Sequence, residues 1–124
     1  MFSINKTLKG KPPRLPFLKI KEHVLGKEYD LSLVFIGSKK SKTLNKKYRG
    51  KDKPANILSF PIDKTEGEIF IDLHEAKKTS KNFNRKYENF VAFLFIHGLF
   101  HLKGYSHGSK MEYEELKTRK RFKI

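Results

Sequence analysis

The chain has 124 residues, which is enough for one hydrophobic core but not for two. Its 28 Lys and Arg against 13 Asp and Glu give a formal net charge of +15, which favours RNA, DNA or an anionic membrane surface over cationic partners. Cysteine is absent, which excludes disulfides and thiolate metal sites. The charge selects a class of partner and not a function, because solubility alone accounts for some lysine excess.

The first third of the chain predicts strands and a helix in alternation. Residues 2–5 alternate apolar and polar side chains, as a short strand does. A helix opens at Pro16 and ends at Gly26. Residues 31–36 are branched and aromatic, which is the strongest strand pattern in the chain.

A second helix is predicted over residues 43–48, with Ser38 or Ser41 as its N-terminal cap and Gly50 at its end. The lysines in and after this segment make it the most basic part of the chain.

Two further strands are predicted over residues 57–60 and 67–72, and the polar turn at residues 63–66 joins them as a hairpin. Pro61 places the first of these strands at an edge or an end, because proline cannot donate to a central ladder. Residues 73–82 read as a polar helix or loop.

A helix over residues 87–102 would be apolar on almost all sides, which predicts that it is buried. A last helix follows, with Ser109 as its cap and Glu112 in capping-box spacing. Its predicted packing side is made by Met111, Tyr113, Leu116 and Phe122. The expected fold is α+β: a single domain over residues 1–124, with a small mixed sheet of about four strands packed on the buried central helix.

Three of the five histidines gather at the end of that helix. His97 and His101 are one helical turn apart and point the same way. Gly104 tolerates positive φ, so the chain can turn back and bring His107 to face them. Three converging imidazoles with an open fourth position are typical of a catalytic zinc site. We expect one Zn²⁺ per chain, although nickel or iron also fits three imidazoles.

The spacing matches the His-x-x-x-His-x-x-Gly-x-x-His frame of metzincin proteases. Those proteases have Glu after the first His as the general base, whereas this chain has Gly98, which argues against peptide hydrolysis. His23 and His74 lack neighbours at ligand spacing and are interpreted as surface or packing residues.

The histidine segment closely resembles the signature of the YbeY family of bacterial endoribonucleases. The matching residues are His97, Gly98, His101, Leu102, Gly104, Tyr105 and His107. A second matching segment contains Leu44, Asn45, Tyr48, Arg49 and then Leu58-Ser59-Phe60-Pro61. The chain departs from the family pattern at Ser106, where Asp is usual, at Ala55-Asn56-Ile57, where Thr-Asp-Val is usual, and at Glu68, where Asp is usual.

The resemblance implies a zinc-dependent endoribonuclease for single-stranded RNA, acting in maturation of the 16S rRNA 3′ end and in ribosome quality control. The implied partners are rRNA and the small ribosomal subunit, with no DNA and no membrane. The apolar run at residues 90–96 is too short to cross a bilayer and the N-terminus lacks a signal-peptide core, so a cytoplasmic protein is expected.

Arg49 is the predicted catalytic cation, because a guanidinium binds phosphate in a bidentate way that lysine cannot match. Lys46, Lys47, Lys51 and Lys53 are the predicted contacts to the RNA backbone. The alternative for each is a solvated surface charge.

The general base stays open, because Ser106 cannot do the work of the family's Asp. Glu68 and Asp63 are candidates, metal-bound hydroxide could attack unaided, and the RNA's own 2′-hydroxyl could attack to leave a cyclic phosphate. Three other functions remain: a non-catalytic ribosome- or RNA-binding protein with a structural metal, a metalloprotease-like hydrolase, and a basic protein without metal.

Overall fold

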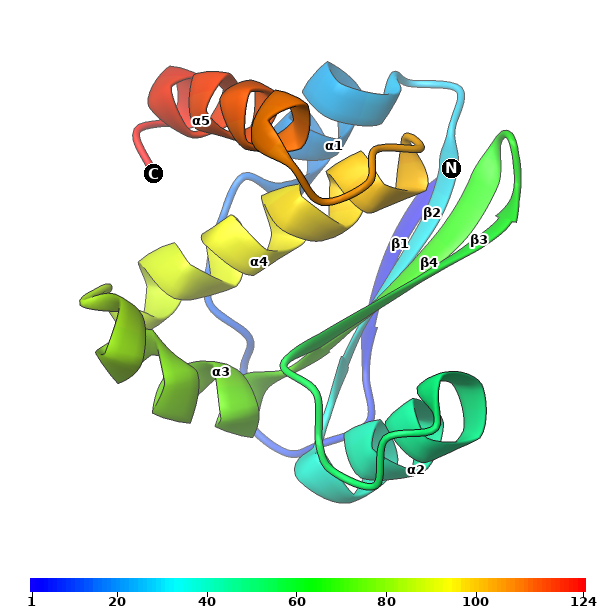
Figure 1. The fold of residues 1–124 in the computed structure, drawn as a ribbon, viewed down its shortest axis with the longest axis vertical. Coiled ribbons are helices and arrows are strands. Elements are labelled where there is room, and N and C mark those ends of the chain that lie inside the picture. The colour runs from blue at the N-terminus through cyan, green and yellow to red at the C-terminus, as the bar shows by residue number, and fades with distance from the viewer.

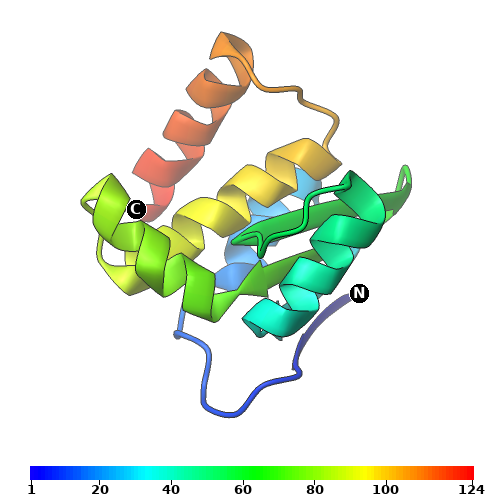
Figure 2. The same ribbon diagram turned by 60° about the horizontal axis from the view of Figure 1, so that its bottom comes forward.

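The computed structural model describes all 124 residues. The chain forms a four-stranded mixed sheet with helices on both faces (Figures 1 and 2). The strands are β1 (Phe2–Lys6), β2 (Asp30–Ile36), β3 (Ile57–Asp63) and β4 (Glu66–Asp72). The helices are α1 (Phe17–Leu25), α2 (Ser38–Arg49), α3 (Leu73–Ser80), the 3₁₀ turn η1 (Lys81–Phe83), α4 (Tyr87–Leu102) and α5 (Ser109–Phe122). The predicted α+β class, the four strands and the buried helix are confirmed.

The strand order in the sheet is β1-β2-β4-β3, with the first three strands parallel and β3 antiparallel to β4. Side chains of β2 and β4 alternate between the two faces, and Leu33 lies opposite Ile69 on the buried face. The predicted hairpin forms between β3 and β4, and the Asp63 carboxylate accepts hydrogen bonds from the Thr65 backbone N–H and hydroxyl at 2.8 and 3.2 Å. β3 is therefore an edge strand, as Pro61 predicted.

Helix α4 lies at the centre of the molecule, with the sheet on one side and α1, α3 and α5 around it (Figure 1). Ten of its 16 residues are buried, and Phe95, Ile96 and Leu99 are fully inaccessible. This cover on several sides explains why the helix is apolar all round instead of along one stripe. No helix combines the length and apolar character required to span a bilayer.

Helix α2 lies on the opposite face of the sheet from α4 (Figure 2). Aromatic rings form part of its contact with the sheet. The ring centroids of Tyr48 and Phe60 are 5.1 Å apart, and those of Phe60 and Phe70 are 5.9 Å apart. The helix begins at Ser38, with Gly37 in the N-cap position, five residues before the predicted start. It ends at Gly50 as predicted, and this glycine adopts a left-handed φ of 69°.

The predicted caps of α2 are wrong, because no side chain caps its first turn. Ser41 instead donates a hydrogen bond of 2.6 Å to Oδ2 of Asp72, a fully buried carboxyl group at the end of β4. The other oxygen of Asp72 accepts from the backbone N–H of Glu75 at 3.0 Å and so caps α3. One carboxyl group therefore joins α2, β4 and α3.

The predicted capping box of α5 is also wrong. Gly108 occupies the N-cap position, so Ser109 already lies inside the helix and its hydroxyl does not cap it. Met111 packs into the core as predicted and Phe122 is partly buried against it, but Tyr113 is 63% exposed and Leu116 42% exposed. The buried face of α5 consists of Met111, Glu115 and Thr118.

We expect Asp72→Ala to lower the free energy of unfolding by about 3 kcal/mol, because it removes a buried hydrogen bond to a carboxyl group and a helix cap together. Urea denaturation followed by circular dichroism measures the change. The control is Asp52→Ala, whose side chain is 64% exposed and meets only Lys42 at 3.9 Å; its effect should stay within about 0.5 kcal/mol. Equal losses in the two variants would contradict the role assigned to Asp72.

Candidate metal centre

The structure brings the three predicted histidines together. His97 and His101 lie on the last turns of α4, and His107 lies in the connection to α5. One nitrogen from each ring falls within 4.8 Å of the others, and Nε2 of His97 is 3.0 Å from Nε2 of His101. His97 and His101 are half-buried and His107 is exposed, so the cluster opens to solvent on the side of His107.

The turn after α4 places His107. The backbone N–H of Gly104 donates to the carbonyl of His101 at 3.0 Å, and that of Tyr105 donates to Phe100 at 3.0 Å. Gly104 has a φ of 106°, a conformation that other residues rarely adopt. The Tyr105 ring then packs edge-on against Phe100 with 5.5 Å between centroids, which anchors the chain beneath the histidines.

A fourth residue joins the centre from α5. Nδ1 of His97 is 2.8 Å from Oε2 of Glu115, whose residue is only 5% exposed. In the neutral ring Nδ1 must carry the hydrogen, because a carboxylate only accepts, and Nε2 then presents its lone pair to the cluster. Sequence analysis missed Glu115. The available signal was its position: with Met111 and Thr118 it forms one helix face, and a carboxylate on a buried face needs a partner.

These residues fit a divalent metal ion. A tetrahedral zinc ion with Zn–N bonds of about 2 Å holds two nitrogens roughly 3.3 Å apart, which is close to the 3.0 Å observed. A metal-ligating histidine usually donates its second ring N–H to a carboxylate, carbonyl or water, and Glu115 is in place to accept from His97 in this way. Burial, together with the charges of His97 and His107, lowers the pKa of His101, which favours the neutral imidazole that ligates metal.

The cluster opens into a cleft of about 1010 Å³ between β3, α4 and α5. Arg49 lines the same cleft as the three histidines, from the end of α2. The side chain is exposed, and no carboxylate lies within ion-pair distance of it. The structure therefore places the predicted cation and the predicted metal ligands on one surface, although they are about 50 residues apart in sequence.

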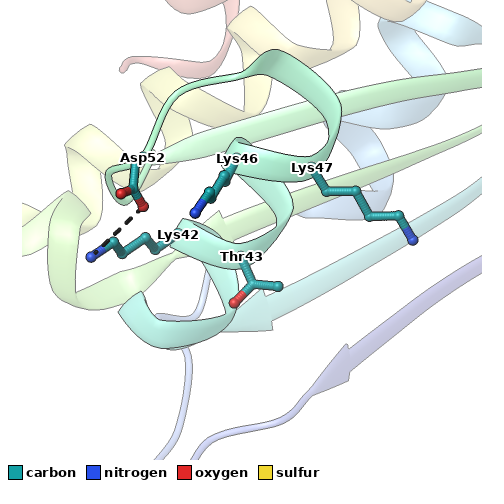
Figure 3. A pocket seen from close by; sticks show the side chains of 5 residues that line it. All are labelled: Lys42, Thr43, Lys46, Lys47 and Asp52. Atoms are coloured by element: carbon teal, nitrogen blue, oxygen red, sulfur yellow. Dashed lines mark ion pairs between the residues drawn. The ribbon is translucent and has the colours of Figure 1, made fainter.

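The predicted lysines lie elsewhere. Lys46 and Lys47 line a separate hollow of about 510 Å³ on α2, together with Lys42, Thr43 and Asp52 (Figure 3). Lys51 and Lys53 are exposed in the following loop, which Asn45 anchors by donating to the carbonyl of Lys53 at 2.9 Å. None of the four lines the cleft of the histidines.

The two candidates for the general base do not line the cleft either. Ile69 and Ile71 of β4 point into the core beside α4, so Glu68, which directly precedes Ile69, points to the other face of the sheet. Asp63 is the last residue of β3, and its carboxylate accepts hydrogen bonds from Thr65 in the hairpin turn. The carboxyl groups that line the cleft are Glu115, which is bound to His97, and the exposed Glu112.

Comparison with known proteins agrees with this geometry. The sequence profile of the family described as endoribonuclease YbeY matches residues 15–123. The chain belongs to the YbeY family. It is 34% identical to the endoribonuclease YbeY of Alkaliphilus metalliredigens (strain QYMF) over 74% of this chain and 66% of that protein. It is 43% identical to the endoribonuclease YbeY of Phytoplasma mali (strain AT) over 70% of this chain and 61% of that protein.

The fold is also similar to a solution structure. TM1509 from Thermotoga maritima superposes with a TM-score of 0.67 and 27% sequence identity, over 98% of this chain and 86% of that chain. The chain spans 60 to 66% of the length of the first curated relatives it matches.

Within this YbeY-family site, the absence of a side chain at Gly98 has a steric reason. A Cβ at this position would lie 2.8 Å from both Ile57 Cδ1 and Ser59 Oγ and 3.1 Å from Ile69 Cδ1. The Ser59 hydroxyl also donates to the Gly98 carbonyl at 3.4 Å. The position that carries the metzincin glutamate is therefore filled here by the close approach of β3 to α4.

We expect Gly98→Glu to lower the free energy of unfolding by about 3 kcal/mol or more, because it overpacks this contact and buries a carboxylate. It should not create peptide hydrolysis. Lys110→Glu, an exposed change on α5, is the control and should cost less than about 0.5 kcal/mol. Thermal unfolding and a casein assay give the two readouts, and a stable variant that digests casein would contradict the steric explanation.

Proposed function

We propose that this chain is a metal-dependent endoribonuclease that cleaves single-stranded RNA, and that residues 1–124 act as one domain. The observation that carries the proposal is that three imidazoles and an unpaired guanidinium open onto one cleft of a strongly basic chain. The name of its curated relatives, endoribonuclease YbeY, supports the same activity. By family resemblance the substrate is rRNA of the small ribosomal subunit, in 16S 3′-end maturation and quality control, which implies a cytoplasmic protein.

The proposed metal ligands are His97, His101 and His107, with one Zn²⁺ as the expected ion. When bound there, zinc supplies Lewis acidity to a phosphate oxygen and acidifies water. The chain's own contribution is orientation: Glu115 accepts from Nδ1 of His97 and so directs Nε2 into the cluster. Three neutral imidazoles accept other divalent ions as well, so zinc rests on the ligand type alone.

Arg49 is the proposed catalytic cation. Its guanidinium lines the cleft without an anionic partner, so its donors are free for phosphate oxygens. In the transition state these donors would offset the charge that builds on the phosphoryl oxygens. Glu112 is the cleft carboxylate free to accept a proton, because Glu115 is already bound to His97.

The lysines extend the binding surface away from the cleft. Lys46 and Lys47 lie on the helix that ends in Arg49, and Lys51 and Lys53 lie in the loop that follows it. An RNA strand bound at Arg49 would meet these charges along its phosphates, with little base specificity and strong salt dependence.

We expect Arg49→Ala to lower RNA cleavage about 100- to 1,000-fold, the usual loss when one donor to a developing oxyanion is removed. Arg49→Lys should recover only part of this, because an ammonium cannot bind phosphate in a bidentate way. Arg14→Ala, an exposed change outside the cleft, is the matched control. The measurement is single-turnover cleavage of a labelled single-stranded RNA.

The same assay decides between the enzyme and a non-catalytic RNA-binding protein, which the Ser106 departure keeps as a second candidate. Chelation and His101→Ala should each abolish cleavage while binding persists. Wild-type protein that binds RNA but cleaves none with zinc, manganese, nickel or iron would overturn the nuclease proposal.

We expect Glu115→Gln to weaken zinc binding by about 10- to 100-fold, because the neutral amide holds the His97 ring less firmly. Competition with a chromophoric chelator measures the affinity without any cleavage assay. The control is Glu114→Gln on the preceding position, whose carboxylate only meets Lys117 at 3.5 Å. Unchanged affinity in Glu115→Gln would show that the contact does not serve the metal.

A further inference from the structure

The cleft continues past the histidines into a cluster of phenylalanines. The rings of Phe90 and Phe93 are stacked with 5.7 Å between centroids and 14° between planes. The Phe83 ring packs against both, and its centroid is 5.2 Å from that of Phe90 and 6.1 Å from that of Phe93. All three rings line the cleft, yet Phe83 is 53% exposed. We call these three residues the aromatic end of the cleft.

Two arginines flank the aromatic end. The guanidinium carbon of Arg85 lies 4.5 Å from the centre of the Phe93 ring, and that of Arg119 lies 5.0 Å from it. Neither forms an ion pair with a carboxylate, and Arg85 donates only to the amide oxygen of Asn89. Burial and the charge of Arg119 lower the pKa of Arg85, as expected for like charges held together without an anion.

An exposed aromatic ring beside unpaired guanidinium groups has the composition of a single-stranded nucleic-acid site. Bases stack on the ring through their π-faces, while the cations meet the phosphates. An apolar peptide would satisfy the apolar surface and the β3 edge, but it would leave the two arginines without an anion. The charges therefore favour a polyanion with planar groups.

The spacing along α4 relates this end to the metal centre. Phe90, Phe93, His97 and His101 all line the cleft from one side of the helix. Phe93 and His97 are four residues apart, which is about 6 Å along the axis. Stacked bases rise about 3.4 Å along one strand, so roughly two nucleotides span this distance.

We propose that Phe83 and the neighbouring arginines form a base-stacking subsite for a nucleotide a few positions away from the phosphate at the metal centre. The subsite rests on the proposed function, because it takes the same RNA strand as the histidines and Arg49. It accepts any base, since stacking on a phenyl ring does not read the hydrogen-bonding edge.

The chain has no tryptophan, so Phe83→Trp introduces a single indole at the subsite, and its fluorescence is excited at wavelengths where the five tyrosines do not absorb. The probe is an eight-nucleotide oligoadenylate RNA with chelator present, so that only binding is measured. We expect its addition to quench the fluorescence of Phe83→Trp, because a base stacks on the indole. An oligomer with abasic residues should bind through its phosphates without this quenching. The control is Tyr113→Trp, at a position that is 63% exposed on α5 but outside the cleft.

The affinity of the same two oligomers gives a second readout. Phe83→Ala should weaken binding of the oligoadenylate by roughly 5- to 30-fold, the lower part of the range for one stacked base. It should leave the abasic oligomer unaffected, as should Tyr113→Ala for both. Phe83→Leu keeps apolar contact with Phe90 and Phe93, so a loss of affinity in this variant too separates stacking from misfolding.

The outcomes separate the subsite from the proposed function. Wild-type protein that binds no single-stranded RNA overturns both. Protein that binds and cleaves RNA with no quenching in Phe83→Trp, or with equal losses for both oligomers in Phe83→Ala, overturns the subsite alone. Quenching by an unstructured peptide and not by RNA would also overturn it and identify a peptide groove.

Discussion

The burial of α4 is the constraint on which the rest of the structure depends. A helix that is apolar on all sides must be covered on all sides, and here the sheet, α1, α3 and α5 provide that cover. On the last turns of the helix this cover is open on one side only, where His97 and His101 are half-buried while Leu99 and Phe100 stay buried. The candidate site is therefore the place where the central buried helix of the fold reaches solvent, and packing on its other sides supports the two histidines that it carries.

Close packing of β3 on α4 has two consequences for the site. It requires the missing side chain of Gly98, which removes the position where a metzincin glutamate would stand. It also makes the edge strand one wall of the cleft. The same frame of three histidines therefore has no glutamate after its first histidine here, because the neighbouring strand occupies the space that a protease uses for its base.

Charge is divided between two regions of the surface. The histidine cleft is lined by Arg49 and Arg119, and the Arg119 guanidinium packs against the Phe93 ring. A guanidinium is a group suited to bidentate hydrogen bonding with phosphate. The lysines gather on α2 and the loop after it, where they are exposed and partly form a hollow of their own (Figure 3). Such an arrangement suits short-range recognition in the cleft and longer-range, salt-sensitive attraction outside it.

Local patterns in the sequence determined most elements of this protein: the central helix, the edge strand at Pro61, the hairpin and the turn at Gly104 that returns His107 to the cluster. The caps of α2 and α5 were predicted wrongly, because one serine hydroxyl binds a distant carboxylate and the other has no cap position. The packing of Tyr113 and Leu116 was also predicted wrongly, since both are exposed. Only the tertiary structure decided the Glu115 contact with His97, the entry of Arg49 into the cleft, the exclusion of Glu68 from it and the pairing of Ser41 with Asp72. The contact of Glu115 with His97 joins residues 18 positions apart, and that of Ser41 with Asp72 joins residues 31 positions apart. Periodicity and turn chemistry act over a few residues, whereas contacts of this range exist only after the sheet and the central helix have packed.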